Sequence, residues 1–497
     1  MRSAAKCLKA ATPNKRYKFE ESKMLLKYFY DTALAHASYM VGCQKTGEAI
    51  LIDPNRNIEH YLSAAAQEDM TIVGTVETHI HADYVSGSRE LAERIGAKIY
   101  VSDEGPADWK YTFVTKYDHM MLRDGSEFSV GNIKFKVMHT PGHTPESISL
   151  VLTDIGGGAD KPMGLFTGDF VFVGSTGRPD LLEEVAGQAG SADPGARALH
   201  RSLQKFKELP NYLQVWPSHG AGSACGKGLG AIPSSTVGYE KLFNEALQFD
   251  TEDAFVDYIL ENQPEAPPYF AVMKHVNKHG PGVLGGKDGP QKIAAAELAD
   301  TVGKQMVLDV RAAQDYAQNH VVGTINIPTK YIARDGGWFI DYEKPLYLIA
   351  EPDILAESIR VLREIGVDNI AGYFDSDEVA NAGLATESYE FKPPKEVVDQ
   401  VNNGDVYLVD VRRQAEWDEG HVPQSAYSFL GSMMSDVTEL PSDKPIVFLC
   451  RTGARSAVAC SIARAKGVMN VINLAGGIVD WKLQSYSVVT DNPQAVV

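Results

Sequence analysis

The stretch Glu77-Thr-His-Ile-His-Ala-Asp-Tyr-Val-Ser-Gly87 decides how the first half of this 497-residue chain folds. It ends a β-type run at 71–78 and leads into a helical pattern at 88–95. His79 and His81 lie two residues apart, and a carboxylate follows two residues later. Two imidazoles and a carboxylate at the end of a strand suit a divalent metal ion. The stretch therefore predicts a metal site.

Three later segments carry residue types that would complete this site. They are His139-Thr-Pro-Gly-His143, Gly168-Asp169 and Ser218-His219-Gly220. Any one of these histidines alone would be explained as a buried, hydrogen-bonded side chain. All four segments in this order favour a shared metal site instead.

The rest of the first half alternates short strands with helices. Strands are predicted at 27–31, 38–43, 49–53, 98–102, 127–138, 147–153, 165–168 and 213–217. Helical spacing is present at 58–70 and 196–209. We expect two mixed sheets packed face to face, with helices outside.

These motifs resemble the metallo-β-lactamase superfamily, and within it the persulfide dioxygenases most. The resemblance is carried by THIHAD at 78–83, TPGHT at 140–144, TGDF at 167–170 and GRPD at 177–180. It implies an α/β fold in which an αββα sandwich carries the metal at the strand ends.

Tyr84 stands where the fuller superfamily pattern, HxHxDH, has its last histidine. A phenol is a poor substitute for an imidazole at a second metal position, so the sequence favours one metal ion. Two histidines and one carboxylate leave three coordination positions open, which suits Fe(II) oxygenases. Zinc stays an alternative, because a zinc-bound water would make this a thioester hydrolase of the glyoxalase II type.

The resemblance also implies a role for individual residues. The ligands of one Fe(II) would be His79, His143 and Asp169. Residues that orient these ligands would be His81, Asp83 and His219. Arg178 would steer an anionic thiol substrate, with a structural salt bridge as the alternative. Cys225, in a Gly-rich loop, would face the iron and carry sulfur, with a small packed loop residue as the alternative.

After three prolines within 264–268, the chain repeats itself. Val307–Arg311 recurs as Leu408–Arg412, and His320-Val321 recurs as His421-Val422, both 101 residues later. Two tandem α/β domains of about 100 residues, each with a covered parallel sheet, are expected. The predicted domains are a basic tail at 1–23, the metal domain at 24–266, and two repeats at 267–390 and 391–497.

Cys450-Arg-Thr-Gly-Ala-Arg-Ser456 follows a buried strand at 446–449 and opens a helix at about 454. Backbone N–H groups that curl toward Cys450 would stabilise an anion on its sulfur. Arg451 and Arg455 would hold an oxyanion. The CxxxxR spacing also fits tyrosine phosphatases and arsenate reductases.

The surrounding motifs resemble the rhodanese family, in which such a cysteine carries sulfane sulfur. They are Asp410-Val-Arg412, Glu416–Pro423 and Leu474–Trp481. We interpret Asp410, Arg412 and His421 as scaffold. In the first repeat, Ala350-Glu-Pro-Asp353 replaces the start of the cysteine loop, so we expect that repeat to be catalytically inactive.

Composition restricts the partners. A net charge of −18 argues against nucleic acid, and no apolar run could cross a bilayer. Five widely spaced cysteines favour a reducing compartment. The basic tail has no signal-peptide core, so a cytoplasmic location is expected, with an organellar presequence as the alternative.

The resemblance implies a fused sulfur-oxidising enzyme. A thiol persulfide and O₂ would give sulfite at iron, and Cys450 would pass sulfur from a second persulfide to sulfite, giving thiosulfate. Glutathione, coenzyme A, bacillithiol and cysteine all stay open as the thiol, and a homo-oligomer also stays open. The alternatives are a zinc hydrolase fused to a sulfurtransferase and a non-enzymatic sulfur sensor.

Overall fold

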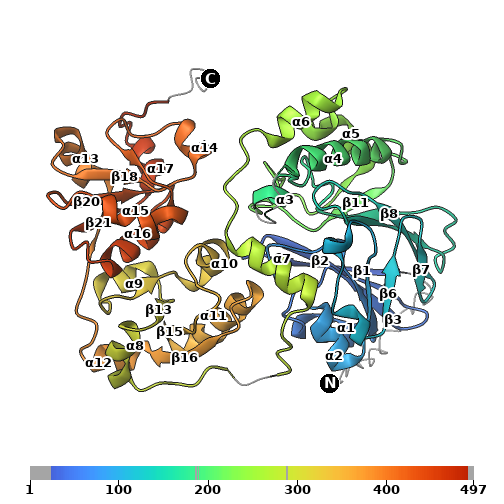
Figure 1. Ribbon diagram of the computed structural model, residues 1–497, viewed down its shortest axis with the longest axis horizontal. Coiled ribbons are helices and arrows are strands. Elements are labelled where there is room, and N and C mark those ends of the chain that lie inside the picture. The colour runs from blue at the N-terminus through green and yellow to red at the C-terminus, as the bar shows by residue number, and fades with distance from the viewer. Residues whose placement is uncertain (1–23, 185–186, 188–189, 287–288, 491–497) are drawn as a thin grey trace, which may run out of the picture.

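The computed structural model describes residues 24–184, 187, 190–286 and 289–490, which form four sheets in two lobes (Figure 1). The predicted basic tail at 1–23 lies outside the described residues. Among the described residues, no helix is both long and apolar enough to cross a membrane.

The first sheet has six strands in sequence order. They are β1 (Met24–Asp31), β2 (His36–Cys43), β3 (Glu48–Ile52), β4 (Thr71–Val76), β5 (Lys98–Ser102) and β6 (His119–Leu122). The first three pair antiparallel, whereas β3 to β6 run parallel. A parallel neighbour needs a crossover, which α1 (Glu59–Gln67) and α2 (Ser88–Ile95) supply. The stretch Glu77–Gly87, called the metal stretch below, therefore lies between the parallel strand β4 and the crossover helix α2.

The second sheet has the order β12-β11-β10-β9-β8-β7. Its strands are β7 (Glu127–Val130), β8 (Ile133–His139), β9 (Ile148–Asp154), β10 (Gly164–Gly168), β11 (Gln214–Pro217) and β12 (Ser235–Thr236). Side chains such as Val41, Phe135, Leu150 and Phe166 fill the space between the two sheets. Burying one such side chain contributes about 1.5–3 kcal/mol. The predicted pair of mixed sheets is confirmed.

The prediction of one continuous strand at 127–138 is wrong, because two antiparallel strands occupy this range. The structure turns at Gly131 and Asn132, so that β7 and β8 form a hairpin. Gly131 has φ 53°, and a Cβ there would lie 2.6 Å from Cβ of Cys43. Only glycine fits this tight turn against β2, and the apolar pattern on either side concealed it.

Helices cover the outer faces of both sheets (Figure 1). Those beside the second sheet are α3 (Leu181–Glu184), α4 (Ala192–Lys207), α5 (Val237–Phe243) and α6 (Glu252–Leu260). Next comes α7 (Tyr269–His279), which lies between the first domain and the repeats. The Asn277 amide donates hydrogen bonds to the carbonyls of His81 and Tyr84, at 2.8 and 2.7 Å. Thus α7 supports the metal stretch, although it follows the predicted domain boundary at 266.

The third sheet is fully parallel, with the order β14-β13-β15-β16. Its strands are β13 (Met306–Asp309), β14 (Ile325–Asn326), β15 (Leu346–Ala350) and β16 (Ile370–Asp375). Its helices are α8 (Leu298–Val302), α9 (Ala313–Gln318), α10 (Ile332–Asp335), α11 (Pro352–Glu364) and α12 (Ser376–Asn381).

The fourth sheet is also parallel, with the order β17-β21-β20-β18-β19. Its strands are β17 (Glu390–Lys392), β18 (Tyr407–Asp410), β19 (Ala426–Tyr427), β20 (Ile446–Leu449) and β21 (Val471–Leu474). Its helices are α13 (Pro394–Asn403), α14 (Gln414–Asp418), α15 (Met433–Asp436), α16 (Ala454–Ala465) and α17 (Gly477–Leu483). The predicted domain boundary at 390/391 falls within β17.

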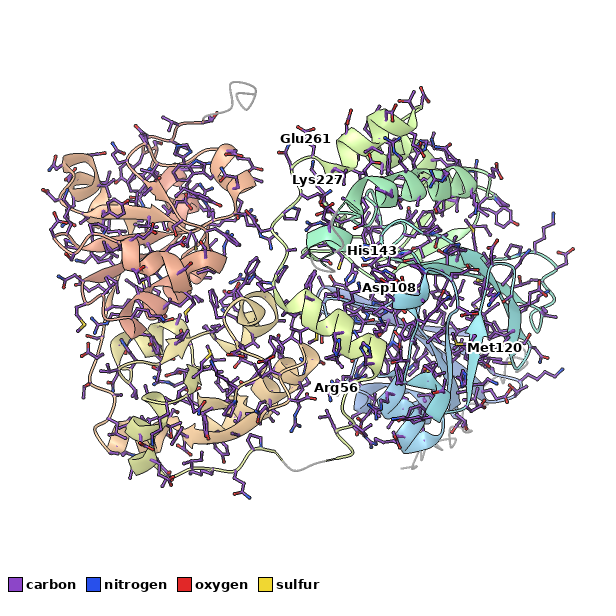
Figure 2. All side chains as sticks on the ribbon, in the orientation of Figure 1. Arg56, Asp108, Met120, His143, Lys227 and Glu261 are labelled. Atoms are coloured by element: carbon purple, nitrogen blue, oxygen red, sulfur yellow. The ribbon has the colours of Figure 1, made fainter. Side chains whose placement is uncertain are left out.

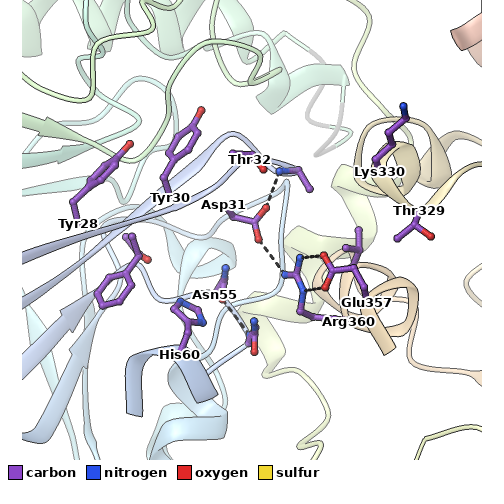
Figure 3. Close-up of a pocket in the computed structure, with 15 residues that line it drawn as sticks. Tyr28, Tyr30, Asp31, Thr32, Asn55, His60, Thr329, Lys330, Glu357 and Arg360 are labelled. Atoms are coloured by element: carbon purple, nitrogen blue, oxygen red, sulfur yellow. Dashed lines mark hydrogen bonds and ion pairs between the residues drawn. The ribbon is translucent and has the colours of Figure 1, made fainter. Parts of the chain in front are cut away.

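Ion pairs join the first domain to helix α11 of the third sheet and to Asp368, which follows that helix. The Arg56 guanidinium, at the junction in Figure 2, forks onto Asp368 at 2.5 and 2.9 Å. Arg360 pairs with Asp31 and Glu357 beside a cavity of about 740 Å³ (Figure 3). The Val85 N–H also donates to the Glu364 carbonyl at 2.8 Å. The metal stretch is therefore held by hydrogen bonds to two helices, α7 and α11.

Candidate metal centre and sulfur-transfer loop

The structure brings His79, His143 and Asp169 together in one buried group. One ligand atom from each lies within 4.8 Å of the others. The Nε2 atoms of His79 and His143 lie 3.7 and 3.5 Å from Oδ2 of Asp169. Within the described chain, neither Asp169 oxygen has a hydrogen-bond partner. A buried carboxylate without donors is costly unless a cation binds it, so this group fits a metal ion.

Hydrogen bonds behind the two histidines turn their Nε2 atoms toward Asp169. The Thr78 hydroxyl donates to Asp53 Oδ2 at 2.8 Å, so its oxygen accepts from Nδ1 of His79 at 3.0 Å. Nδ1 of His143 donates to the Arg178 carbonyl at 3.0 Å. Each ring is thereby held in the tautomer that leaves the Nε2 lone pair free for a metal.

Burial lowers the pKa of both rings below the usual histidine value. For His79, the charges of His81 and His143 lower the pKa further. For His143, the Asp169 carboxylate opposes the effect of burial in part. Both imidazoles are therefore neutral at pH 7, which is the form that binds metals.

The loop at 177–178 is packed directly against two of these groups. A Cβ on Gly177 would lie 2.0 Å from the Asp169 carbonyl oxygen and 3.0 Å from Cβ of His143. A glycine is required at this close approach. The GRPD segment thus closes one side of the group.

His81 points away from the metal group, into a buried carboxylate pair. Its Nε2 lies 3.1 Å from Oδ1 of Asp53 and 3.2 Å from Oε2 of Glu77. Burial alone would lower its pKa, but these carboxylates raise it well above the usual histidine value. Its ring still packs against that of His79, with ring centroids 4.2 Å apart, and hydrogen bonds through Asp53 and Thr78 also connect the two residues.

Asp83, His219 and Cys225 form a second buried group beside the first. Nε2 of His219 lies 3.3 Å from Oδ2 of Asp83 and 3.4 Å from Oδ1 of Asp169. Within the described chain, both Asp83 oxygens and Nε2 of His219 lack hydrogen-bond partners. The second group therefore also has the donor set of a metal site, and it shares Asp169 with the first.

Tyr84 does not take part in either group. Its hydroxyl donates to the Asp53 carbonyl at 3.3 Å, and its ring packs 3.9 Å from that of His36. The phenol thus faces the core behind the metal stretch.

The Cys225 thiol belongs to the second group. Burial, followed by the charges of Asp83 and Asp169, raises the pKa of that thiol well above its usual value.

Arg178 is fully buried and is engaged by the protein itself. Its guanidinium pairs with Asp180 and donates to the Ala224 carbonyl at 3.2 Å. Its backbone N–H donates to the Cys225 carbonyl at 3.1 Å. Arg178 ties the Cys225 loop to His143, which favours the salt-bridge alternative over contact with substrate.

Sequence reasoning missed the carboxylates that support the metal stretch. Asp53 binds Thr78, His81 and the Ser218 hydroxyl, and Glu77 binds His81. Both lie at the ends of predicted strands, at 49–53 and 71–78, and directly follow β3 and β4 in the structure, which was the available signal. Glu146 was missed as well, and its Oε1 accepts the Ile80 N–H at 2.8 Å.

Glutamine in place of Glu146 is expected to stabilise the fold at alkaline pH. Burial raises the pKa of Glu146 from 4.5 to about 7. Ionisation therefore destabilises the fold as pH rises from 4.5 to 7, by up to about 3 kcal/mol above pH 7. Glu146→Gln keeps the acceptor for Ile80 and removes the charge. Urea unfolding should show a gain at pH 8 and little change at pH 4.5.

A matched control for this prediction is Glu127→Gln, which removes an exposed carboxylate on β7. It should change the urea midpoint little at either pH. A loss of stability by Glu146→Gln at pH 8 would contradict the assignment of a costly buried charge.

Cys450 lies at the base of the predicted loop, between β20 and α16. The Gly453 N–H is 3.1 Å and the Ser456 hydroxyl 3.3 Å from its Sγ. The helix α16 begins at Ala454, so its N-terminus is directed at the loop. The Gly453 N–H and the start of α16 thus face the sulfur and would stabilise negative charge on a persulfide attached to it.

The two loop arginines differ in their surroundings. Arg451 is exposed. Arg455 forks onto the Glu416 carboxylate at 2.5 and 2.7 Å. In the scaffold, Arg412 pairs with Asp410, and the His421 ring stacks 3.7 Å from that of Trp417.

The first repeat lacks this loop altogether. There β15 ends at Ala350 and α11 begins at Pro352, with Glu351 between them. In the second repeat, residues 450–453 separate β20 from α16. In the first repeat the helix begins where the second repeat has its loop, so Ala350 is not enclosed by a loop like that of Cys450.

Two family models match the chain. The metallo-beta-lactamase superfamily model matches residues 31–219, and the rhodanese-like domain model matches residues 393–484. A beta-lactamase hydrolase-like protein of Xylella fastidiosa (strain 9a5c) is 29% identical over 52% of this chain, which spans 60% of that relative's length. Persulfide dioxygenase ETHE1, mitochondrial, of Bos taurus is 26% identical over 46% of this chain and 78% of its own length.

A solved structure extends the match beyond the first domain. The crystal structure of a metallo-beta-lactamase from Staphylococcus aureus subsp. aureus COL is 43% identical, with a TM-score of 0.65. The match covers 71% of this chain and 99% of that one. With its two six-stranded sheets and its buried histidine–aspartate groups, the chain belongs to the metallo-β-lactamase superfamily and carries a rhodanese-like domain at 393–484.

Proposed function

We propose that this protein is a persulfide dioxygenase with a built-in sulfurtransferase. The observation that carries the proposal is the buried His79–His143–Asp169 group, which leaves open positions on one metal ion, in the same chain as the Cys450 loop. One Fe(II) held there would supply the activation of O₂. The overall reaction converts persulfide, O₂ and water to thiol and sulfite.

In this proposal, Cys225 receives the outer sulfur of the persulfide as a protein-bound intermediate, and the thiol leaves. The Cys225 thiol lies in one group with His219, whose Nε2 has no partner among the described residues. That nitrogen is placed to accept the thiol proton, which burial otherwise retains on sulfur. Arg178 positions the Cys225 loop rather than the substrate.

The second half of the proposal concerns Cys450. Its thiolate attacks the outer sulfur of a second persulfide, forming Cys450–S–S⁻ and releasing the thiol. Sulfite then attacks the outer sulfur, the protein S–S bond breaks, and thiosulfate leaves with Cys450 as thiolate. The first repeat, with Ala350 and no loop, is inactive and joins the metal domain to the second repeat.

Metal analysis and oxygen uptake test the first half of the proposal. Protein purified without air should contain about one Fe(II) per chain and consume O₂ when glutathione persulfide is added. Paired zinc ions and no O₂ uptake would overturn it. Coenzyme A persulfide and cysteine persulfide, compared by kcat/KM, would identify the preferred thiol.

A zinc-dependent thioester hydrolase is the second candidate function. The Asp83–His219–Cys225 group, which shares Asp169 with the first, favours it by offering a second metal position. This candidate predicts two zinc ions per chain and hydrolysis of an acylated glutathione. The same metal analysis therefore separates the two functions.

A further inference from the structure

The metal stretch is an almost fully buried segment, without regular helix or strand, between β4 and α2. Its backbone N–H and carbonyl groups therefore need partners from other segments. Up to Ile80 these partners belong to the metal domain. The Thr78 N–H donates to the Asp53 carboxylate at 2.7 Å. The Ile80 N–H donates to the Glu146 carboxylate at 2.8 Å. The backbone of 81–86 is held by α7 and α11 instead.

One buried amide on α7 serves three backbone groups of this segment. The Asn277 amide nitrogen donates to the carbonyls of His81 and Tyr84. Its amide oxygen accepts the Ser86 N–H at 2.9 Å. Asn277 lies beyond residues 31–219, the range that the superfamily model matches. The end of the metal stretch is therefore held by a helix outside that range.

A tyrosine on the same helix holds the backbone of the second buried group. The hydroxyl of Tyr269, a buried residue, donates to the Asp83 carbonyl at 3.1 Å. The Asp83 carboxylate lies 3.3 Å from Nε2 of His219, and that nitrogen lies 3.4 Å from Oδ1 of Asp169. Movement of the Asp83 backbone would therefore change the surroundings of a ligand in the first group.

The inactive repeat packs its backbone against α7 at two glycines. A Cβ on Gly337 would lie 2.1 Å from Cδ1 of Tyr269. A Cβ on Gly366 would lie 2.1 Å from Cε of Met273. Both distances are too short for any side chain, so the repeat touches these α7 side chains directly. The Tyr269 ring is thus fixed by the repeat, while its hydroxyl holds the metal stretch.

The repeat also bonds to the metal stretch without an intermediary, because the Glu364 carbonyl of α11 accepts the Val85 N–H at 2.8 Å. We propose that the inactive repeat positions the metal centre, and that Tyr269 is the positioning residue through which it acts on Asp83. This role needs no cysteine loop in the repeat. It applies whether iron or zinc occupies the site, so it does not rest on the proposed function.

Titration of the metal-free full chain with Co(II) tests this role, because the visible spectrum of bound Co(II) reports its coordination geometry. Tyr269→Phe keeps the ring against Gly337 and removes only the hydrogen bond to Asp83. It should weaken Co(II) binding about tenfold and change the spectrum, as expected when a group that orients metal ligands is lost. Gly337→Ala should act in the same direction, because its new Cβ displaces the Tyr269 ring from another domain.

Each variant has a matched control in the same repeat. Tyr342→Phe removes a hydroxyl that donates to the Ile365 carbonyl at 2.8 Å, within the repeat itself. It should lower the thermal midpoint and leave Co(II) binding unchanged. At Gly303, φ is −67° and an added Cβ would lie 3.6 Å from its nearest neighbour, so Gly303→Ala should also leave Co(II) binding unchanged.

The Co(II) affinity separates positioning from general packing. If Tyr269→Phe lowers the thermal midpoint as Tyr342→Phe does, but keeps the parent's Co(II) affinity and spectrum, α7 only stabilises the fold and the inference is overturned. An unchanged affinity in a folded Gly337→Ala protein overturns the role of the repeat as well. Paired zinc ions and no O₂ uptake in the parent would overturn the dioxygenase proposal and leave this comparison of affinities intact.

Discussion

Serine in place of Cys450 is expected to abolish thiosulfate formation while persulfide-dependent O₂ uptake continues. A serine hydroxyl beside the Gly453 N–H cannot become a nucleophilic anion at neutral pH, so the sulfurtransferase rate should fall by at least about 10³-fold. Oxygen uptake should persist, because His79, His143 and Asp169 belong to a different domain. An oxygen electrode and a thiosulfate assay on the same sample would measure both rates.

The control for this prediction is Cys460→Ala. Cys460 is a buried thiol in α16, the same helix that begins at the Cys450 loop. Its removal should cost some stability but leave thiosulfate formation in place. If O₂ uptake and thiosulfate formation vanish together in Cys450→Ser, the division of labour between the two domains is wrong.

Asparagine in place of Asp169 should remove the metal and with it O₂ uptake. Asp169 is the carboxylate that both histidines of the first group face, at 3.7 and 3.5 Å. Loss of a residue that only orients a metal ligand costs 10–100-fold in affinity, so loss of a ligand's charge should cost at least about 100-fold. Elemental analysis and the oxygen electrode would check it, and Cys450 sulfur transfer should continue.

The stability of the metal-free Asp169→Asn protein and the metal content of an Asp83→Asn variant test the same group. The metal-free Asp169→Asn protein should be at least as stable as the metal-free parent, because the parent buries a carboxylate without donors. Asp83→Asn should keep one iron per chain if the first group holds the only metal. If it instead halves the metal content, the two-metal hydrolase is favoured.

Local motifs were sufficient to predict that His79, His143 and Asp169 lie together and that Cys450 begins a loop between a strand and a helix. Each of the three residues lies in a short segment after a strand: His79 follows β4 of the first sheet, and His143 and Asp169 follow β8 and β10 of the second. Cys450 and its donors lie within seven consecutive residues, so their geometry is largely local. The same reasoning indicated the parallel sheets of both repeats, because strands alternate with helices there.

Side-chain directions could not be predicted in the same way. Arg178 follows the metal carboxylate in sequence, yet its guanidinium points to Asp180 and Ala224. His81 shares the stretch with His79 but points to Asp53 and Glu77. In each case the deciding partner is a buried charge or carbonyl whose position depends on how the whole domain packs.

The sequence by itself determined which atoms are available for chemistry: two histidines and a carboxylate at strand ends, and a cysteine before a helix. Only the tertiary structure decided which of them meet. It placed Cys225 beside Asp83 and His219, turned Tyr84 to the core, and brought Gln414 to Glu265 of another domain. The physical reason is that short-range backbone geometry is encoded within a motif, whereas the pairing of buried charges depends on residues that are far apart in the chain.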